Sequence, residues 1–184
     1  MRRQKNKHIH QIPFNLLLSV TKGIAAAALA LCVEKGWLDY QVSVARYWLE
    51  FSVNGKQDIL VSDLLSHRVG LPSVEQTLTA DDAYNWDRMI SLLAAQKPHW
   101  EPGSVHGYHT YTFRFLAGKL IRRVDLQHRS CGQFVRDELD KEFYIGVSHS
   151  KIKACIAPLI RKEVRMRFLK WYSKTRRHIY IYTK

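Results

Sequence analysis

The chain has 184 residues, of which 46% are hydrophobic, and it carries a formal net charge of +13 at pH 7. This length suits one domain, and the hydrophobic share is ample for a core. Its three cysteines, Cys32, Cys131 and Cys155, are widely spaced and form no C-x-x-C pair, which excludes a disulfide framework. The apolar run 23–33 is too short to span a bilayer, and there is no clear signal peptide, so we expect a soluble, intracellular chain.

The charge is divided unevenly along the chain. Residues 1–18 contain four basic residues and no acidic one, residues 19–150 contain fourteen basic and fifteen acidic, and residues 151–184 contain eleven basic and one acidic. We therefore interpret the chain as a basic N-terminal extension, a near-neutral globular segment 19–147, and a basic C-terminal tail 148–184. Alternative splicing or an imperfect gene model at both ends would give the same pattern.

Apolar periodicity predicts a mainly helical middle segment. Glycine and proline turns, such as Gly70-Leu71-Pro72 and Pro102-Gly103, separate the helices. The predicted helix at 80–96 has three acidic residues near its start, which complement the helix dipole: Asp81, Asp82 and Asp87. In chain order, the predicted helices cover residues 19–35, 61–67, 80–96, 110–124 and 130–141.

The first predicted helix begins with Ser19-Val20-Thr21-Lys22. Residues at i and i+3 share a helix face, so the Lys22 amine can reach the Ser19 hydroxyl, which gives a nucleophile with a base beside it. The pattern alone is weak, because 148–151 and 150–153 also fit S-x-x-K without any catalytic context. The plain alternative is that Ser19 is an ordinary helix N-cap.

Further along the chain, additional segments resemble the serine β-lactamase-like family, especially its esterase-like and animal β-lactamase-domain members. One of them, residues 59–72, contains Leu64-Leu65-Ser66-His67-Arg68-Val69-Gly70-Leu71-Pro72, which is similar to the family's L-L-x-H-x-x-G-L-P segment. The resemblance runs from Ser19 to about Val147. In family order, the similar segments cover residues 19–40, 44–51, 59–72, 100–109 and 115–125.

The resemblance implies roles for three side chains. Ser19 would be the acylated nucleophile, Lys22 its base, and Tyr108 a general acid/base that shares or relays the proton to the leaving group. Many family members have asparagine two residues after this tyrosine, where this chain has Thr110, and this departure favours an esterase-like or altered site. Tyr111 is the alternative tyrosine, but Tyr108 follows the Pro102-Gly103 turn at the better spacing. The alternative interpretation of Tyr108 is an aromatic side chain that only packs against the turn.

The third motif of the family, a Lys or His followed by Thr or Ser and Gly, is not found in the chain. Lys174-Thr175-Arg176 is the nearest match, and an arginine in place of the glycine would fill space that the substrate needs. The strands that precede the nucleophile helix in the family are also absent. We therefore expect the helical middle portion of the β-lactamase/transpeptidase-like α/β fold, truncated at both ends and lacking most of the antiparallel sheet.

The missing sheet has an energetic consequence. A lysine with the ordinary pKa of about 10.4 needs a depression of roughly 3 units, or about 4 kcal/mol, to act as a base near pH 7. In the family, much of the wall that buries the lysine is the sheet, which also supplies one oxyanion donor worth on the order of 100-fold in rate. We therefore expect weak turnover or none.

Two classes of function follow. The first is a serine hydrolase that cleaves an ester or amide through an acyl-Ser19 intermediate. The second is a non-catalytic binding or regulatory fragment, whose basic tail contacts a protein partner, an anionic membrane or nucleic acid through a predicted amphipathic helix at 158–172. The alternative, which we favour, is that the tail is a disordered or loosely attached extension with no specific role. Apolar surface left by the missing sheet favours self-association or a protein partner.

No cofactor and no metal site is predicted. His106 and His109 flank Tyr108, but no carboxylate or cysteine lies at a spacing that would complete a zinc site. We interpret His67 as a structural residue that ends a short helix. Cys32, on the apolar nucleophile helix, is expected in the core.

Overall fold

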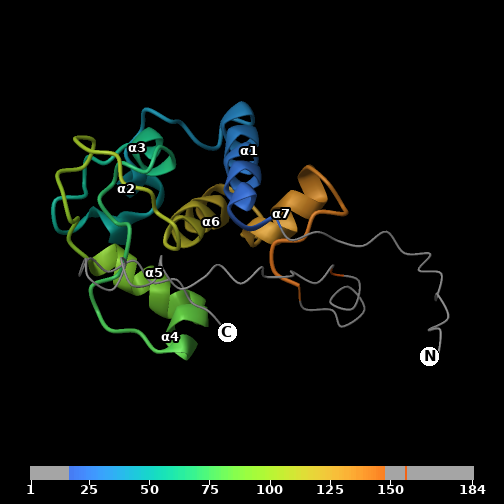
Figure 1. The fold of residues 1–184 in the computed structure, drawn as a ribbon. Helices are drawn as coiled ribbons and strands as arrows, with labels where there is room; N and C mark the ends of the chain where they lie inside the picture. Colours follow the sequence, from blue (N-terminus) through green and yellow to red (C-terminus); the bar gives the residue numbers. More distant parts are fainter. Residues whose placement is uncertain (1–16, 148–155, 157–184) are drawn as a thin grey trace, which may run out of the picture. The chain divides into compact units, whose positions relative to one another are not determined.

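The computed structural model describes residues 17–147 and 156. The predicted amphipathic helix at 158–172, the Lys174-Thr175-Arg176 segment and nearly all of both basic ends lie outside these described residues. The elements of the described part are η1 (Leu18–Val20), α1 (Thr21–Glu34), α2 (Val44–Tyr47), η2 (Leu49–Ser52), α3 (Val61–Leu65), α4 (Ala80–Tyr84), α5 (Trp86–Ala95), α6 (Phe113–Val124) and α7 (Cys131–Glu138) (Figure 1).

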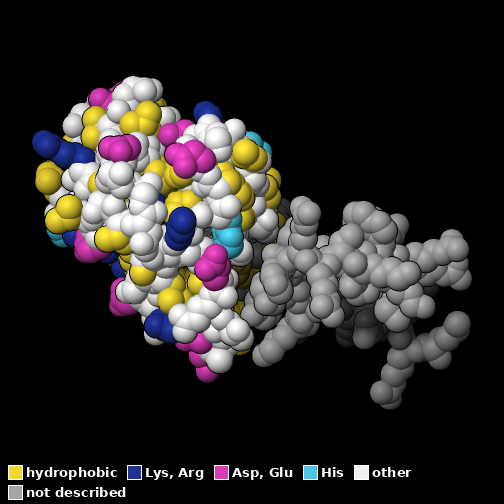
Figure 2. All heavy atoms as spheres, turned by 90° about the vertical axis from the view of Figure 1, so that its left-hand side faces the viewer, with side chains coloured by type: hydrophobic (Ala, Val, Ile, Leu, Met, Phe, Trp, Pro, Cys, Tyr) yellow, Lys and Arg dark blue, Asp and Glu magenta, His cyan; other side chains and the backbone are white. Residues whose placement is uncertain are grey.

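Within the described residues the protein is mainly α-helical. The β structure assigned to its globular part is one isolated antiparallel bridge between Ser43 and Leu60, formed where the Val44 amide donates to the Ile59 carbonyl at 2.8 Å. Residues Ser19–Ile145 belong to one compact unit. On the face drawn in Figure 2, acidic, basic and apolar side chains are interspersed, as expected for the near-neutral middle segment.

The α1 helix forms from the alanine-rich run and buries one face. Ala25, Ala28, Leu29 and Cys32 recur at helical spacing and are buried. Cys32 therefore lies in the core, as predicted, and burial raises its thiol pKa to about 11. A 3-10 turn, η1, precedes α1, so the predicted helical stretch is confirmed with a tighter first turn.

The α2 to α3 region contributes aromatic side chains to the core. Ser43 caps α2 by accepting a hydrogen bond from the Ala45 amide at 3.1 Å. Trp48 and Phe51 are buried, with ring centroids 4.9 Å apart. The α3 helix ends at Leu65, two residues earlier than predicted.

The prediction of one continuous helix at 80–96 is wrong. The structure has two helices there, α4 and α5, which are separated at Asn85. Asn85 has an extended backbone, and its side chain accepts a hydrogen bond from the Arg88 amide at 3.0 Å, which makes it the N-cap of α5. Thr79 and Asp82 form a capping box at the start of α4. A capping residue inside the apolar pattern is the reason for the break.

The α6 helix is the centre of the described fold and contacts α1, α2, α3, α5 and α7 (Figure 1). It begins at Phe113 rather than at the predicted residue 110, and it ends at Val124 as predicted. The α7 helix covers the middle of the predicted 130–141 range and starts with a capping box between Ser130 and Gln133. In the part of the chain that is described, no helix has the length and apolar character needed to cross a membrane.

Candidate active site

Ser19 and Lys22 lie together at the start of α1. The Lys22 Nζ atom donates a hydrogen bond to the Ser19 Oγ atom at 3.5 Å. The cap position of α1 is Val20, and no side chain caps this helix, so the alternative interpretation of Ser19 as an N-cap is wrong. Ser19 is exposed and Lys22 is partly buried. The hydroxyl is therefore open to a substrate.

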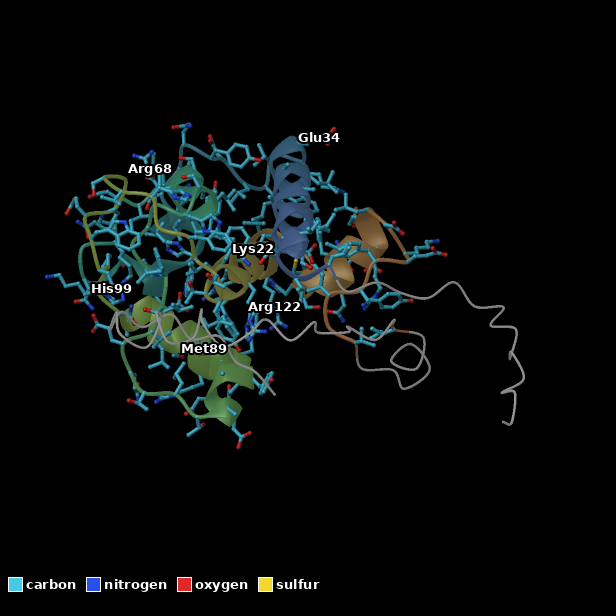
Figure 3. All side chains as sticks on the ribbon, viewed as in Figure 1. Lys22, Glu34, Arg68, Met89, His99 and Arg122 are labelled. Atoms are coloured by element: carbon cyan, nitrogen blue, oxygen red, sulfur yellow. The ribbon has the colours of Figure 1, made fainter. Side chains whose placement is uncertain are left out.

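Tyr108 reaches the same place from the loop before α6. The Lys22 Nζ atom lies 5.1 Å from the centroid of the Tyr108 ring. The pKa of Tyr108 is lowered, chiefly by a hydrogen bond with the Ser19 side chain, against a smaller opposing effect of burial, and further by the hydrogen bond and the charge of Lys22. The ring is 47% exposed. Three groups that can carry a proton thus meet at the end of α1 where Lys22 is labelled in Figure 3.

The loop that carries Tyr108 is held by histidines and a tryptophan. The buried His109 accepts a hydrogen bond from the Leu71 amide at its Nε2 atom, at 3.0 Å, and its Nδ1 atom lies 2.5 Å from the Gly107 carbonyl oxygen. These contacts fit the neutral ring, and burial lowers the pKa of His109 to about 4. Gly107 lies against the Trp100 ring, where a Cβ atom would come within 2.3 Å of it. The backbone is therefore fixed on both sides of Tyr108.

Tyr111, the alternative tyrosine, has a different environment. Its hydroxyl donates a hydrogen bond to the Ala83 carbonyl at 3.2 Å and accepts one from Arg114 at 2.7 Å. These partners belong to α4 and α6. The arrangement favours Tyr108 as the tyrosine of the site.

A cavity of about 490 Å³ lies beside Tyr108. Tyr108 belongs to its lining, whereas Ser19 and Lys22 do not. Most of the lining surface is apolar. Its apolar part includes Pro72, Val74, Leu78, Met89 and Trp100.

The histidines near Tyr108 do not form a metal site. His106 is exposed, whereas His109 is buried and bonded to the backbone. Across residues 17–147 and Ile156, no group of three or more His, Cys, Asp or Glu side chains is arranged to hold a metal ion.

Comparison with known proteins identifies the family to which these features belong. The sequence pattern of the beta-lactamase family, described simply as "Beta-lactamase", matches residues 16–150. The chain belongs to the beta-lactamase family. A family relative, the esterase/beta-lactamase LipL of Mycobacterium tuberculosis, is 34% identical over 109 residues, which are 59% of this chain and 25% of the relative.

Solved structures of the family agree with this assignment. A family VIII carboxylesterase is 35% identical and superposes with a TM-score of 0.73, over 78% of this chain and 40% of the esterase. A penicillin-binding protein homologue from Caulobacter crescentus is 31% identical with a TM-score of 0.77, over 84% of this chain and 42% of the homologue. The described residues are therefore a mainly helical portion of the β-lactamase/transpeptidase-like fold.

The chain spans a quarter of the length of the LipL relative and about two fifths of these two solved structures. The structure brings Ser19, Lys22 and Tyr108 together. Sequence reasoning assigned no functional part to His67, although its side chain and backbone both contact the Tyr108 loop, and it did not find the cavity. The histidine position within the family-like segment 59–72 was the available signal, but its spacing predicts no contact with Tyr108.

Proposed function

We propose that the chain is a serine hydrolase that cleaves a carboxylic ester through an acyl-Ser19 intermediate. The proposal is supported most strongly by the 3.5 Å contact of Lys22 with Ser19 and by the placement of Tyr108 over the same amine. Esterase relatives of the beta-lactamase family point in the same direction.

In the proposed reaction, the neutral form of the Lys22 amine accepts the Ser19 proton while the Ser19 Oγ atom attacks the ester carbonyl carbon. Tyr108, whose pKa is lowered by Ser19 and Lys22, then relays this proton to the alkoxide that leaves when the ester C–O bond breaks. Water hydrolyses the acyl-Ser19 bond with the same groups, which restores the free hydroxyl.

The cavity beside Tyr108 supports an ester that has an apolar group. Pro72, Val74 and Leu78 are on its wall, and Trp100 and Met89 also line it. A pocket of about 490 Å³ is within the usual size range for small-molecule sites, which are lined mainly by apolar side chains. An apolar acyl or alcohol group in this cavity would extend from a carbonyl carbon held near Ser19.

We expect the turnover to be slow. The 184 residues contain no K-T-G, K-S-G or H-T-G, so we expect them to lack the donor that the third motif supplies in the family. Removal of one oxyanion donor typically costs about 100-fold to 1,000-fold in rate. Acylation by an activated reagent is therefore a better first assay than turnover of an ordinary ester.

The test is the intact mass of the protein after incubation with a fluorophosphonate and with a 4-nitrophenyl ester of a short fatty acid. One adduct is expected on the wild type and on Ser150→Ala, whose serine begins another S-x-x-K match. Ser19→Ala should carry none. A folded wild type without an adduct, or an adduct that persists in Ser19→Ala, would overturn the proposal.

A second candidate function, binding without catalysis, is favoured by the charge of residues 151–184, which contain eleven basic residues and one acidic residue. Such a tail binds polyanions through counterion release. Binding to heparin or to anionic vesicles that weakens with salt and is lost when 151–184 are deleted would support it. Equal binding by the shortened chain would contradict it.

A further inference from the structure

His67 joins α3 to the Tyr108 loop by two backbone-directed hydrogen bonds. Its Nδ1 atom accepts from the His109 amide at 3.1 Å, and its carbonyl oxygen accepts from the Gly107 amide at 3.1 Å. These two amides belong to the residues immediately before and after Tyr108. One residue of a distant segment therefore holds the backbone on both sides of the tyrosine.

The imidazole ring of His67 also contacts Tyr108 itself. The two ring centroids are 4.9 Å apart, and the planes are inclined at 61°, which is an edge-to-face arrangement. On its other sides the His67 ring contacts Phe113 at 4.9 Å, His109 at 5.4 Å and His106 at 5.9 Å. The ring is thus enclosed by the loop that it supports.

The backbone of His67 is unusual for a residue with a side chain. Its φ angle is 62°, in the left-handed region that residues other than glycine adopt uncommonly, with asparagine, aspartate and histidine enriched among them. This conformation ends α3 and turns the imidazole toward Tyr108. A residue with this uncommon conformation that also makes specific contacts with a site is a candidate for a functional role.

The protonation state that these contacts require is the neutral one. Nδ1 can accept from the His109 amide only when it carries no proton. Burial lowers the pKa of His67, and the charges of His106 and Lys22 lower it further. The titratable groups that face the ring are Lys22, His106, Tyr108 and His109.

We propose that His67 is the positioning residue that holds the Tyr108 hydroxyl beside Ser19 and Lys22. This inference rests on the proposed function for its catalytic meaning, whereas the placement of Tyr108 can be measured without any catalysis. His67 itself touches no reacting atom. It acts through the two hydrogen bonds and the ring contact that fix the Gly107–His109 segment.

The decisive variants are His67→Asn and His67→Phe. Asparagine tolerates a positive φ and has a side-chain oxygen close to the place of Nδ1, so it should keep the bond to the His109 amide. Phenylalanine keeps an aromatic ring but has no acceptor. The control is His128→Phe, because His128 also has a positive φ of 53° and bonds through Nδ1 to the Arg122 carbonyl, but it is exposed and distant in sequence.

The readout is the ¹³C NMR titration of the Tyr108 ring carbon bonded to oxygen in ¹³C-tyrosine protein, with the signal assigned by its absence in Tyr108→Phe. In the wild type and in His128→Phe, Tyr108 should titrate below the ordinary pKa of about 10. His67→Phe should return Tyr108 to the ordinary range, and His67→Asn should keep the lowered pKa. An unchanged Tyr108 titration in folded His67→Phe would overturn the proposal.

A second readout separates this inference from the proposed function. Where the wild type is labelled at Ser19, the labelling rate should fall about 10-fold to 100-fold in His67→Phe and be largely retained in His67→Asn. Equal rates in both variants would overturn the proposal. Where the wild type is not labelled, the hydrolase proposal fails, and the Tyr108 titration still decides the role of His67.

If His67→Phe does not fold, His67→Gln replaces it, because the longer side chain places its oxygen near Nε2 rather than near Nδ1. Far-UV circular dichroism establishes folding in each case. A Tyr108 pKa that is raised in His67→Gln and lowered in His67→Asn supports the proposal. The same Tyr108 pKa in both variants contradicts it.

Discussion

The two ends of α1 differ in how firmly their polar groups are held. At the first end, Ser19 is exposed and its hydrogen bond with Lys22 is 3.5 Å long. At the other end, where Glu34 lies in Figure 3, Lys35 donates to the Glu138 carboxylate at 3.1 Å, and Glu138 accepts at 2.9 Å from Arg129. One helix thus connects an open polar cluster to a closed one.

The closed cluster is centred on Arg129. Its guanidinium donates two hydrogen bonds of 2.9 Å to the two oxygens of Asp125 and also contacts Asp137 at 3.2 Å. Asp125 is 1% exposed, and its pKa is lowered, chiefly by the hydrogen bond from Arg129. Such bidentate, partly buried pairs are the strong kind of ion pair.

The two ends of α1 have different roles, one in stability and the other in reactivity. The Arg129 cluster ties α7 and the end of α6 to the end of α1, so it supports the fold without any reacting group. At the open end, the alignment of Ser19, Lys22 and Tyr108 depends on a loop that His67 holds. Substitutions in the Arg129 cluster should therefore change the unfolding free energy, and substitutions around Ser19 should change the rate of reaction.

The largest effect on stability is expected at Arg129. Arg129→Met leaves the buried Asp125 carboxylate without its partner, so the free energy of unfolding should fall by about 3 to 5 kcal/mol in urea denaturation. The control is Arg123→Met, which removes a more exposed ion pair with Glu50 and should cost at most about 1 kcal/mol. Equal losses in the two variants would contradict the account of the closed end.

At the open end, Tyr108→Phe should separate chemistry from stability. Loss of the hydroxyl removes the group that interacts with Ser19 and Lys22, so the rate of Ser19 labelling should fall about 100-fold. Because the ring is 47% exposed, the free energy of unfolding should change by less than about 1 kcal/mol. Tyr84→Phe, at an 80% exposed tyrosine, should change neither quantity, and a matching loss of labelling there would contradict the assignment.

Lys56 differs from Arg129 in its hydrogen-bond partner. It is buried, and its amine donates a hydrogen bond of 2.5 Å to the neutral Gln96 carbonyl oxygen, whereas Arg129 donates to carboxylates. Burial lowers its pKa to about 8, below the ordinary value of about 10.4, so the folded state favours the neutral amine. Burial of the protonated amine therefore lowers the unfolding free energy. This loss is fully present below pH 8 and disappears as the pH rises toward 10.4.

Lys56→Met tests this difference. The variant should be more stable than the wild type by about 2 kcal/mol at pH 7, and the advantage should shrink between pH 8 and pH 10. Urea denaturation of both proteins across this pH range measures it. A constant difference in unfolding free energy would show that Lys56 does not titrate in this range.

The smallest effect is expected at Gly23, beside Lys22 on α1. A Cβ atom at Gly23 would meet no other atom within 4 Å, so Gly23→Ala should raise the unfolding free energy by about 0.5 to 1 kcal/mol and leave Ser19 labelling unchanged. Gly36→Ala is the matched control, since its Cβ would also meet open space but its φ is +72°. Thermal denaturation should show a gain for the first variant and a loss for the second, and a gain in both would contradict the conformational argument.

The elements that the sequence predicted best are those decided by a long, uniform pattern. The alanine-rich run predicted α1, and the spacing of Ala25, Ala28 and Cys32 identifies its buried face. The helix at 80–96 was predicted as one element because apolar periodicity continues through Asn85, whose side-chain capping bond interrupts it. Local hydrogen bonds of single polar residues are weak signals in a pattern of apolar spacing.

The site was predictable only in part for a similar reason. The i, i+3 spacing predicted the contact of Ser19 with Lys22, because both residues belong to one local segment. Tyr108 is distant in the sequence, so only the family resemblance suggested it. His67 was interpreted as structural, since neither its positive φ nor its hydrogen bond with His109 follows from a local pattern.

The most direct test of the central claim is peptide mapping of the fluorophosphonate adduct on the wild type, with Ser19→Ala treated in parallel. The account predicts one adduct, on the peptide that contains Ser19, and none on the variant. A folded wild type that remains unlabelled, or an adduct on any other residue that persists in Ser19→Ala, would contradict the claim that the open end of α1 is an activated nucleophile.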